Sequence, residues 1–183
     1  MKGTDKTMKN LRVHSESRYL MWDDGKPFFY LGDTAWEMFH KLSQNEISYY
    51  LSVRKQQGFN VIQATALAGR DGLAEPNAYG RIPLCMIDNK FDPTKPDEGN
   101  GYDYWKHVDF AVEKALEKEM FIALLPTWGD KFNIKWGIGP EIFTPENAYI
   151  YGKWIGKRYS SYQNIIWVLG GDRPLETPEH EAI

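Results

Sequence analysis

Residues 165–173 read Ile-Ile-Trp-Val-Leu-Gly-Gly-Asp-Arg, an almost entirely apolar run that ends in glycine and aspartate. Two more apolar runs end in the same dipeptide, at Gly32-Asp33 and Gly129-Asp130, and a fourth ends nearby at Gly69-Arg70-Asp71. Short, continuous apolar runs are typical of parallel strands that are buried on both faces. Because such strands end on the same side, the four runs predict a row of carboxylates along one edge of a sheet.

Helical patterns lie between consecutive runs, so the chain alternates between strand and helix. The apolar runs occupy residues 28–31, 61–64, 121–125 and 165–169. Such alternation predicts the α/β class. We expect a (β/α)8 TIM-barrel type fold, of which this chain covers about the first four β-α units. In such barrels the chemistry takes place at the carboxyl ends of the strands.

Local signals indicate where the helices begin and end. The first long helix is expected to begin after Ser43, with Glu46 completing a capping box, and to end before Gly58. Apolar residues at helical spacing over 105–116 predict the second helix. Residues 144–146, Thr-Pro-Glu, form an N-terminal cap signature for the third.

The N-terminal part is expected to contain a β-hairpin. Residues 11–22, the turn Asp23-Asp24-Gly25-Lys26 and the Phe28 run together predict this hairpin, because Asp-Gly tolerates the positive φ that a tight turn needs. We expect this hairpin to lead into the first barrel strand and to cover the bottom of the barrel. Residues 1–10 indicate a disordered or tag-like segment, and residues 11–183 a partial (β/α) barrel domain.

Composition excludes several classes of partner. The chain has 183 residues, enough for one core, and a net charge of -3 that gives no reason to expect nucleic acid or an anionic membrane as partner. No stretch reaches the roughly 18 apolar residues of a membrane span, and the polar N-terminus lacks the apolar segment of an export signal. With a single cysteine, Cys85, and four dispersed histidines, we expect no disulfide framework, no metal and no cofactor.

The connection over residues 68–101 is long and rich in proline and glycine. Connections of this length are typically functional or disordered, and Asp71, Tyr79 and Arg81 favour the functional interpretation. At the other end, Thr177-Pro178-Glu179 repeats the cap signature just before the chain stops. We therefore expect a truncated barrel, whose open strand edges favour self-association.

Asp172 is the strongest catalytic candidate. Glycoside hydrolysis needs two carboxylates that flank the scissile bond, one as an acid and one as a base or nucleophile. Asp172 follows the most hydrophobic run through Gly170-Gly171, and residues without side chains let a substrate approach the backbone closely. The alternative is that Asp172 only caps the turn before Pro174.

The other three carboxylates have structural alternatives of their own. Asp33 is also placed to cap a short helix, and Asp130 to form a surface ion pair with the neighbouring Lys131. Asp71 is no stronger individually. The prediction of a substrate-binding edge depends on all four falling at the same edge of the sheet.

Aromatic residues make up 15% of the chain, and several follow predicted strands. Trp36, Trp128 and Trp136 lie just beyond strand ends, where an indole face is able to stack on the C–H surface of a sugar ring. Ordinary packing is the alternative for each of them. Trp105 and Trp154 lie on helix stripes and are assigned to the core.

Several of these motifs together resemble the apiosidase-like glycoside hydrolases. They are Leu31-Gly32-Asp33-Thr34-Ala35-Trp36, Gly58-Phe59-Asn60-Val61-Ile62-Gln63, Pro76-Asn77-Ala78-Tyr79-Gly80, Leu125-Pro126-Thr127-Trp128-Gly129-Asp130-Lys131 and Trp167-Val168-Leu169-Gly170-Gly171-Asp172-Arg173. The resemblance runs from about Val13 to Pro174. It implies a (β/α)8 barrel that acts on plant pectic side-chain oligosaccharides, with Asp172 as general acid/base.

The resemblance also implies a second catalytic carboxylate, a glutamate on a later strand, which has no counterpart in this chain. The isolated chain is therefore expected to be inactive, and because family members are usually exported, the localisation stays open. The predicted substrate-binding residues are Asp33, Trp36, Asp71, Trp128, Asp130, Lys131 and Arg173. The alternatives are a non-catalytic carbohydrate-binding half-barrel and a fragment that works only after pairing with another half-barrel.

Overall fold

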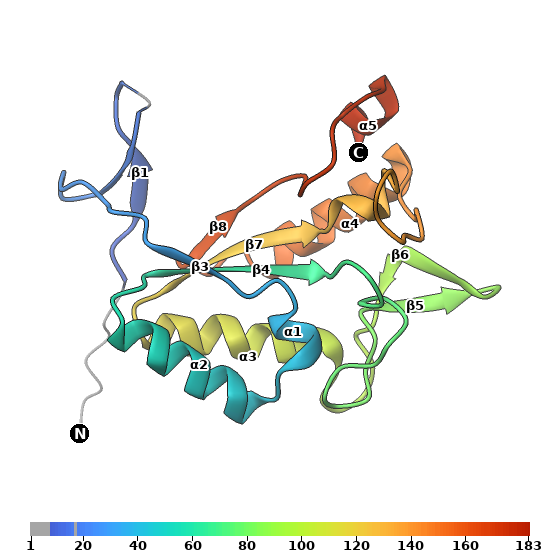
Figure 1. Ribbon diagram of the computed structural model, residues 1–183, viewed down its shortest axis with the longest axis horizontal. Coiled ribbons are helices and arrows are strands. Elements are labelled where there is room, and N and C mark those ends of the chain that lie inside the picture. The colour runs from blue at the N-terminus through green and yellow to red at the C-terminus, as the bar shows by residue number, and fades with distance from the viewer. Residues whose placement is uncertain (1–7, 17) are drawn as a thin grey trace.

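A parallel sheet of four strands forms the centre of the computed structural model, which describes residues 8–16 and 18–183 (Figure 1). Each strand pairs with the one before it in the sheet, as at the start of a (β/α) barrel, and Ile62 lies opposite both Asp33 and Ile122. The predicted α/β fold, a partial barrel, is confirmed. The strands, in spatial order, are β3 (Gly32–Thr34), β4 (Val61–Leu67), β7 (Phe121–Thr127) and β8 (Ile165–Trp167).

The predicted helices form between these strands, with the predicted caps. Ser43 and Glu46 make the capping box, and Gly58 adopts a φ of 91° just beyond the first long helix. The Thr144 side chain accepts a hydrogen bond from the Asn147 main chain, and Pro145 takes the first helical position. The helices are α1 (Met38–Lys41), α2 (Gln44–Gln56), α3 (Tyr104–Glu117), η1 (Gly129–Lys131), α4 (Pro145–Arg158) and α5 (Pro178–Ala182).

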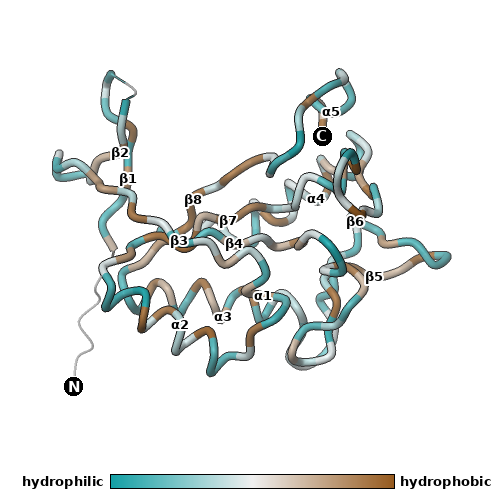
Figure 2. The backbone as a smooth tube through the Cα atoms, in the orientation of Figure 1, coloured by the Kyte–Doolittle hydropathy of each residue, from teal (hydrophilic) through white to brown (hydrophobic). Residues whose placement is uncertain are grey.

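The strands divide their side chains between two cores, as the two-residue period of a strand requires. Ile62 and Ile122 pack with α2, α3 and α4 in the larger core. Val61, Phe121 and Ala123 face the opposite side and belong to a smaller core. The hydropathy colouring shows a hydrophobic stretch along β8 and alternating hydrophobic and hydrophilic segments along α2 and α3 (Figure 2).

The N-terminal hairpin covers the amino ends of the strands. It consists of β1 (Leu11–Val13) and β2 (Leu20–Trp22), and the chain then turns again so that Met21 pairs with Pro27. The rings of Trp22 and Phe28 lie 4.9 Å apart, and Phe28 lies 5.5 Å from Phe121 at the start of β7. An N-terminal hairpin at this end of the sheet is confirmed, but its pairing differs from the prediction. β1 pairs with β2 within residues 11–22, and the predicted turn at Asp24-Gly25 leads only to the bridge between Met21 and Pro27.

Part of the predicted tag-like segment is placed by the structure. Residues 1–7 lie outside the described residues, whereas Met8 is buried in the smaller core with Phe28 and Val61.

The first barrel strand lies further along the chain than its apolar run suggested. Residues 28–31 are not a strand of the sheet, because the Phe28 main chain bonds to Leu20 in the hairpin and Phe29 is 78% exposed. The strand is Gly32–Thr34 instead. Asp33 therefore lies within a strand and not beyond its end, and this changes the direction of its side chain.

The long connection contains a hairpin of its own. Strands β5 (Leu84–Ile87) and β6 (Lys90–Pro96) are joined by Asp88 and Asn89, both at positive φ as a two-residue hairpin turn requires. At its base Arg81 forms an ion pair with Asp97. The hairpin lies at the carboxyl side of the sheet (Figure 1), and its pairing orders residues 84–96 of this connection.

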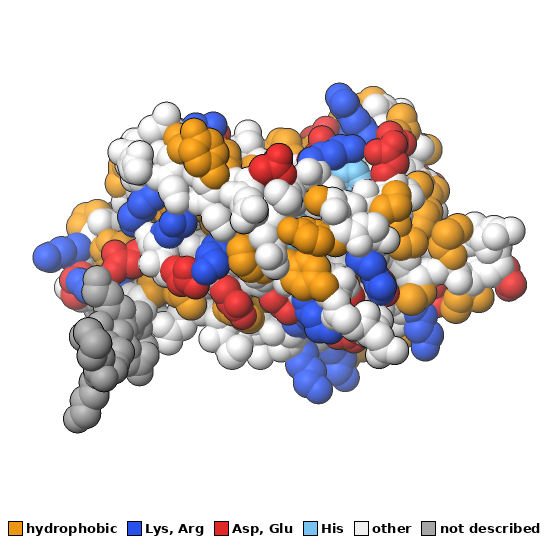
Figure 3. All heavy atoms as spheres, turned by 90° about the horizontal axis from the view of Figure 1, so that it is seen from below, with side chains coloured by type: hydrophobic (Ala, Val, Ile, Leu, Met, Phe, Trp, Pro, Cys, Tyr) orange, Lys and Arg blue, Asp and Glu red, His pale blue; other side chains and the backbone are white. Residues whose placement is uncertain are grey.

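The surface carries both signs of charge. On the face formed by α2 and α3, basic and acidic side chains are interspersed (Figure 3). Among residues 8–16 and 18–183, no helix is both long and apolar enough to cross a bilayer.

Candidate active site

The segments that follow all four strands of the sheet meet at one cavity of about 600 Å³. It lies at the carboxyl edge of the sheet, where (β/α) barrels place their chemistry. Five of the eight predicted site residues line this cavity, namely Trp36, Trp128, Asp130, Asp172 and Arg173. The remaining lining residues are Glu37, Gly69, Arg70, Trp136, Gly137 and Ile138.

Asp172 reaches the cavity through two glycines with positive φ. Gly170 and Gly171 have φ values of 94° and 109°, and a Cβ at Gly171 would lie 2.8 Å from the main-chain nitrogen of Gly129. A side chain there would therefore push β8 away from β7. The Asp172 side chain is 48% exposed, and its Oδ1 accepts a hydrogen bond from the buried Arg173 guanidinium. The guanidinium thus fixes the direction of a carboxylate that is open to a substrate.

Asp130 and Lys131 form a buried ion pair at the back of the cavity. Lys131 Nζ lies 3.0 Å from Asp130 Oδ1 and donates to the Gly139 carbonyl at 2.8 Å. Burial lowers the pKa of Lys131, an effect that the hydrogen bond and charge of Asp130 oppose. The predicted pairing is present but it is internal, and Lys131 does not line the cavity.

Two tryptophans form an aromatic wall. The rings of Trp36 and Trp128 lie 5.3 Å apart at an angle of 53°. A Cβ at Gly69 would lie 2.9 Å from Trp128 Cδ1, so the glycine leaves room for the indole. Both rings are half-buried and line the cavity, as expected for surfaces that receive the C–H face of a sugar.

Asp33 is turned away from this cavity. Its Oδ2 accepts hydrogen bonds from Tyr50, at 2.7 Å, and from Arg54, both on α2. Partial burial raises the pKa of Asp33, but these hydrogen bonds outweigh it and bring the pKa below its usual value. The same pair of effects, burial and the bond to Asp33, raises the pKa of Tyr50 to about 12. Asp33 is therefore not brought together with the residues that line this cavity, because its position inside β3 directs its side chain to the helix side.

Asp71 also lies outside the cavity. It is exposed, and its carbonyl accepts hydrogen bonds from the main chains of Ala74 and Glu75 in a turn. The neighbouring Arg70 takes its place in the cavity lining, at a φ of 51°. The predicted row of four carboxylates is thus reduced to Asp130 and Asp172.

Comparison with known proteins gives the family. The model of the apiosidase-like catalytic domain matches residues 14–183, nearly the whole chain. The chain belongs to the apiosidase-like family. A search of curated proteins returns no match.

Solved structures agree with this apiosidase-like assignment. A family 5 glycoside hydrolase from Bacteroides vulgatus ATCC 8482 is 31% identical with a TM-score of 0.77, over 94% of this chain and 35% of that one. A second glycoside hydrolase is 33% identical with a TM-score of 0.75, over 95% and 37%. An endo-1,4-beta-mannanase from Rhizomucor miehei, 14% identical with a TM-score of 0.57 over 85% and 46%, shares the fold. The chain thus spans little more than a third of its two more similar relatives and is a glycoside hydrolase-like domain.

Sequence reasoning missed two charged residues that line the cavity. Glu37 lines the cavity one residue after Trp36, and Arg70 lines it one residue before Asp71. Glu37 follows the end of β3 and Arg70 follows the end of β4. A short motif does not indicate which of two adjacent side chains points into the cavity, because that direction depends on the turn beyond the strand.

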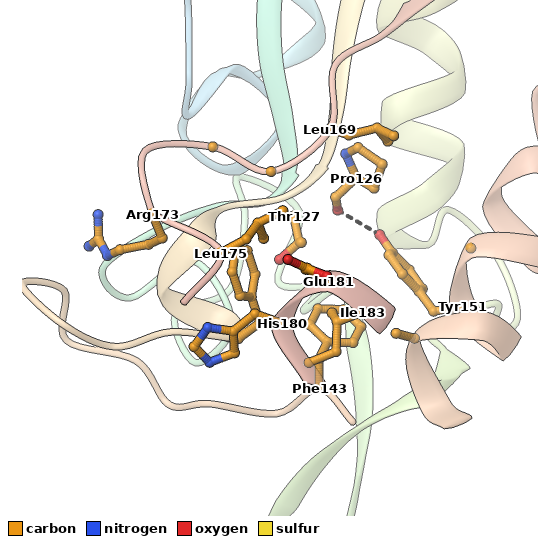
Figure 4. A pocket seen from close by; sticks show the side chains of 15 residues that line it. Pro126, Thr127, Phe143, Tyr151, Leu169, Arg173, Leu175, His180, Glu181 and Ile183 are labelled. Carbon is orange, nitrogen blue, oxygen red and sulfur yellow. Dashed lines mark hydrogen bonds between the residues drawn. The ribbon is translucent and has the colours of Figure 1, made fainter. Parts of the chain in front are cut away.

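A second cavity, of about 440 Å³, lies between β7, α4 and α5. Its lining is mostly apolar, and the Tyr151 hydroxyl donates to the Pro126 carbonyl at 2.8 Å (Figure 4). The Arg173 side chain extends away from Tyr151 and Phe143 in this view. Within the described residues, no group of three or more side chains is arranged to hold a metal ion.

Proposed function

We propose that this domain takes part in hydrolysing plant pectic side-chain oligosaccharides, with Asp172 as the general acid/base. The observation that carries the proposal is the juxtaposition of an exposed, oriented Asp172 carboxylate with the Trp36–Trp128 pair in one cavity. Membership of the apiosidase-like family supports the substrate class.

The roles follow from what the reaction needs. A general acid/base must reach the glycosidic oxygen, and Asp172 is the more accessible of the two aspartates that line the cavity. Asp130 is committed to Lys131 and to the Gly139 main chain, so it is not free to exchange protons with a substrate. The second catalytic carboxylate, in this proposal, comes from a later strand of a complete barrel.

The first experiment measures binding and turnover separately. The 183-residue chain is titrated calorimetrically with an apiose-containing pectic oligosaccharide, and released sugars are followed by chromatography. We expect binding without turnover, because only one of the two catalytic carboxylates is present. Turnover by this chain would refute that assignment. Absence of binding would refute the proposed substrate.

The second experiment tests Asp172 in a barrel completed by the remaining strands. Asp172→Asn should lower kcat by about 10²–10⁴-fold while leaving substrate affinity nearly unchanged. Substrates with a good leaving group should lose less, since they depart without protonation. Asp71→Asn is the matched control because Asp71 is exposed and lies outside the cavity. Near-normal turnover by Asp172→Asn would assign this residue to the turn only. A completed barrel that binds without turnover would favour a non-catalytic carbohydrate-binding domain.

A further inference from the structure

The segment over residues 132–143, here called the Trp136 loop, forms the outer wall of the cavity. Trp136 and Ile138 line the cavity and are 60% and 61% exposed. The Arg173 guanidinium covers one side of the Trp136 ring, 4.8 Å from its centroid. Lys135 Nζ lies 5.6 Å from the same ring but forms an ion pair with Glu176. The indole is therefore supported from within the protein and still presents a large exposed surface.

The buried pair of Asp130 and Lys131 holds the middle of this loop through its main chain. Lys131 Nζ donates to the Gly139 carbonyl at 2.8 Å, and Asp130 Oδ2 accepts from the Gly139 main-chain nitrogen at 3.2 Å. The main-chain carbonyl of Gly139 is thus bound by Lys131, and its main-chain N–H by Asp130. The pair is nearly inaccessible, with side chains 2% and 0% exposed.

Gly137 brings the loop into direct contact with this pair. A Cβ at Gly137 would collide with the Cβ of Asp130 and lie 2.6 Å from a guanidinium nitrogen of Arg173. The backbone between Trp136 and Ile138 therefore rests on Asp130 and Arg173 with no room for a side chain. Any displacement of Asp130 must move the residues on both sides of Gly137.

We propose that Asp130 and Lys131 are positioning residues, which hold Gly137 and Gly139 so that Trp136 stands as a stacking platform for the apolar face of a sugar ring. They act through the loop and do not bind the sugar themselves. The sugar part of this inference rests on the proposed function, whereas the positioning part does not. In this proposal the buried ion pair of Asp130 and Lys131 orients the cavity wall in addition to stabilising the fold.

The experiment follows Trp136 directly in the 183-residue chain. Tryptophans are labelled with 5-fluorotryptophan, and Trp136→Phe identifies the Trp136 resonance. Lys131→Met and Asp130→Asn should each shift or broaden this resonance and leave that of Trp105, in the core, unchanged. The matched control is Arg158→Met, which breaks two other side-chain ion pairs, to Asp109 at 2.6 Å and to Glu98 at 2.8 Å, away from the cavity. If the Trp136 resonance moves no more in Lys131→Met than in Arg158→Met, the pair stabilises the fold only and the inference is wrong.

Sugar affinity provides the second readout. Trp136→Ala and Lys131→Met should each weaken binding of the pectic oligosaccharide by on the order of tenfold, and Arg158→Met should not. If Lys131→Met fails to fold, Gly137→Ala tests the same contact, since it leaves the pair intact and displaces the loop. Unchanged affinity in Trp136→Ala would overturn the platform. If unmutated protein binds no pectic oligosaccharide, the proposed function and the platform for that sugar fail, while the resonance still decides whether the pair positions the loop.

Discussion

Replacing Lys131 by methionine should have a large effect on stability, and the structure supplies the magnitude. Methionine keeps most of the length of the side chain but removes the charge and the donor to Gly139. At 3.0 Å and an effective dielectric constant of 20, the attraction between Lys131 and Asp130 is about 5 kcal/mol. Removing one partner of a buried pair typically costs about 3–5 kcal/mol, because the other charge is left uncompensated.

A double-mutant cycle separates the pair from the packing around it. Asp130→Asn alone should also destabilise, since Lys131 keeps its buried charge. The double variant Asp130→Asn/Lys131→Met carries neither charge, so it should be destabilised by at least about 2 kcal/mol less than the sum of the single variants.

The assay is urea unfolding followed by circular dichroism, with equal m-values required before free energies are compared. Because burial lowers the pKa of Lys131, the unfolded chain holds this proton more tightly than the folded protein does, and the free energy of unfolding relative to Lys131→Met should rise as the pH is raised toward 10. The difference between the unmutated protein and Lys131→Met isolates that slope from other groups. Additive single mutants would show that the two side chains are not coupled as the structure indicates, and a pH-independent difference would show that burial does not lower the pKa of Lys131.

Three further predictions concern the rest of the molecule. Burial lowers the pKa of His107, although its hydrogen bond to the Leu42 carbonyl opposes this effect. Urea unfolding should therefore show the free energy of unfolding falling below about pH 6.5, where the histidine of the unfolded chain takes up a proton. His107→Gln should flatten this pH dependence. Trp105→Ala should cost about 3–5 kcal/mol because Trp105 is fully buried, whereas calorimetry should show Trp128→Ala weakening sugar binding with a smaller loss of stability. The open edges at β3 and β8 predict self-association, which light scattering after size-exclusion chromatography detects; a monodisperse monomer at high concentration would argue against it.

The order of strands and helices was predictable because it depends on signals within a few residues. The capping box at Ser43 and Glu46 and the Thr144-Pro145 cap are local hydrogen-bonding choices, and both formed as predicted. The four apolar runs located three strands correctly for the same reason. The exception, residues 28–31, is apolar because Phe28 packs in the smaller core with the hairpin, a contact between segments that no local pattern contains.

The sequence predicted the location of the candidate site, at the carboxyl ends of the strands, better than it predicted which residues line the cavity. Asp172 and the two tryptophans lie where the strand ends put them. Asp33 does not, because it lies inside β3 and not beyond the end of a strand, and strand alternation directs its side chain to the helices. The role of Lys131 was hidden as well, since its partner atoms belong to the main chain of Gly139 in a loop whose path depends on tertiary contacts.

The hairpin of β5 and β6 offers a practical route into solution studies. The only cysteine of the sequence, Cys85, is exposed on β5, and the hairpin stands out at the carboxyl side of the sheet (Figure 1). One thiol-reactive dye therefore labels each molecule at a single known point without genetic modification. In a mixture of donor-labelled and acceptor-labelled samples, association of two chains would be detected as energy transfer between the dyes. The cavity residues stay unmodified because the dye is attached at Cys85.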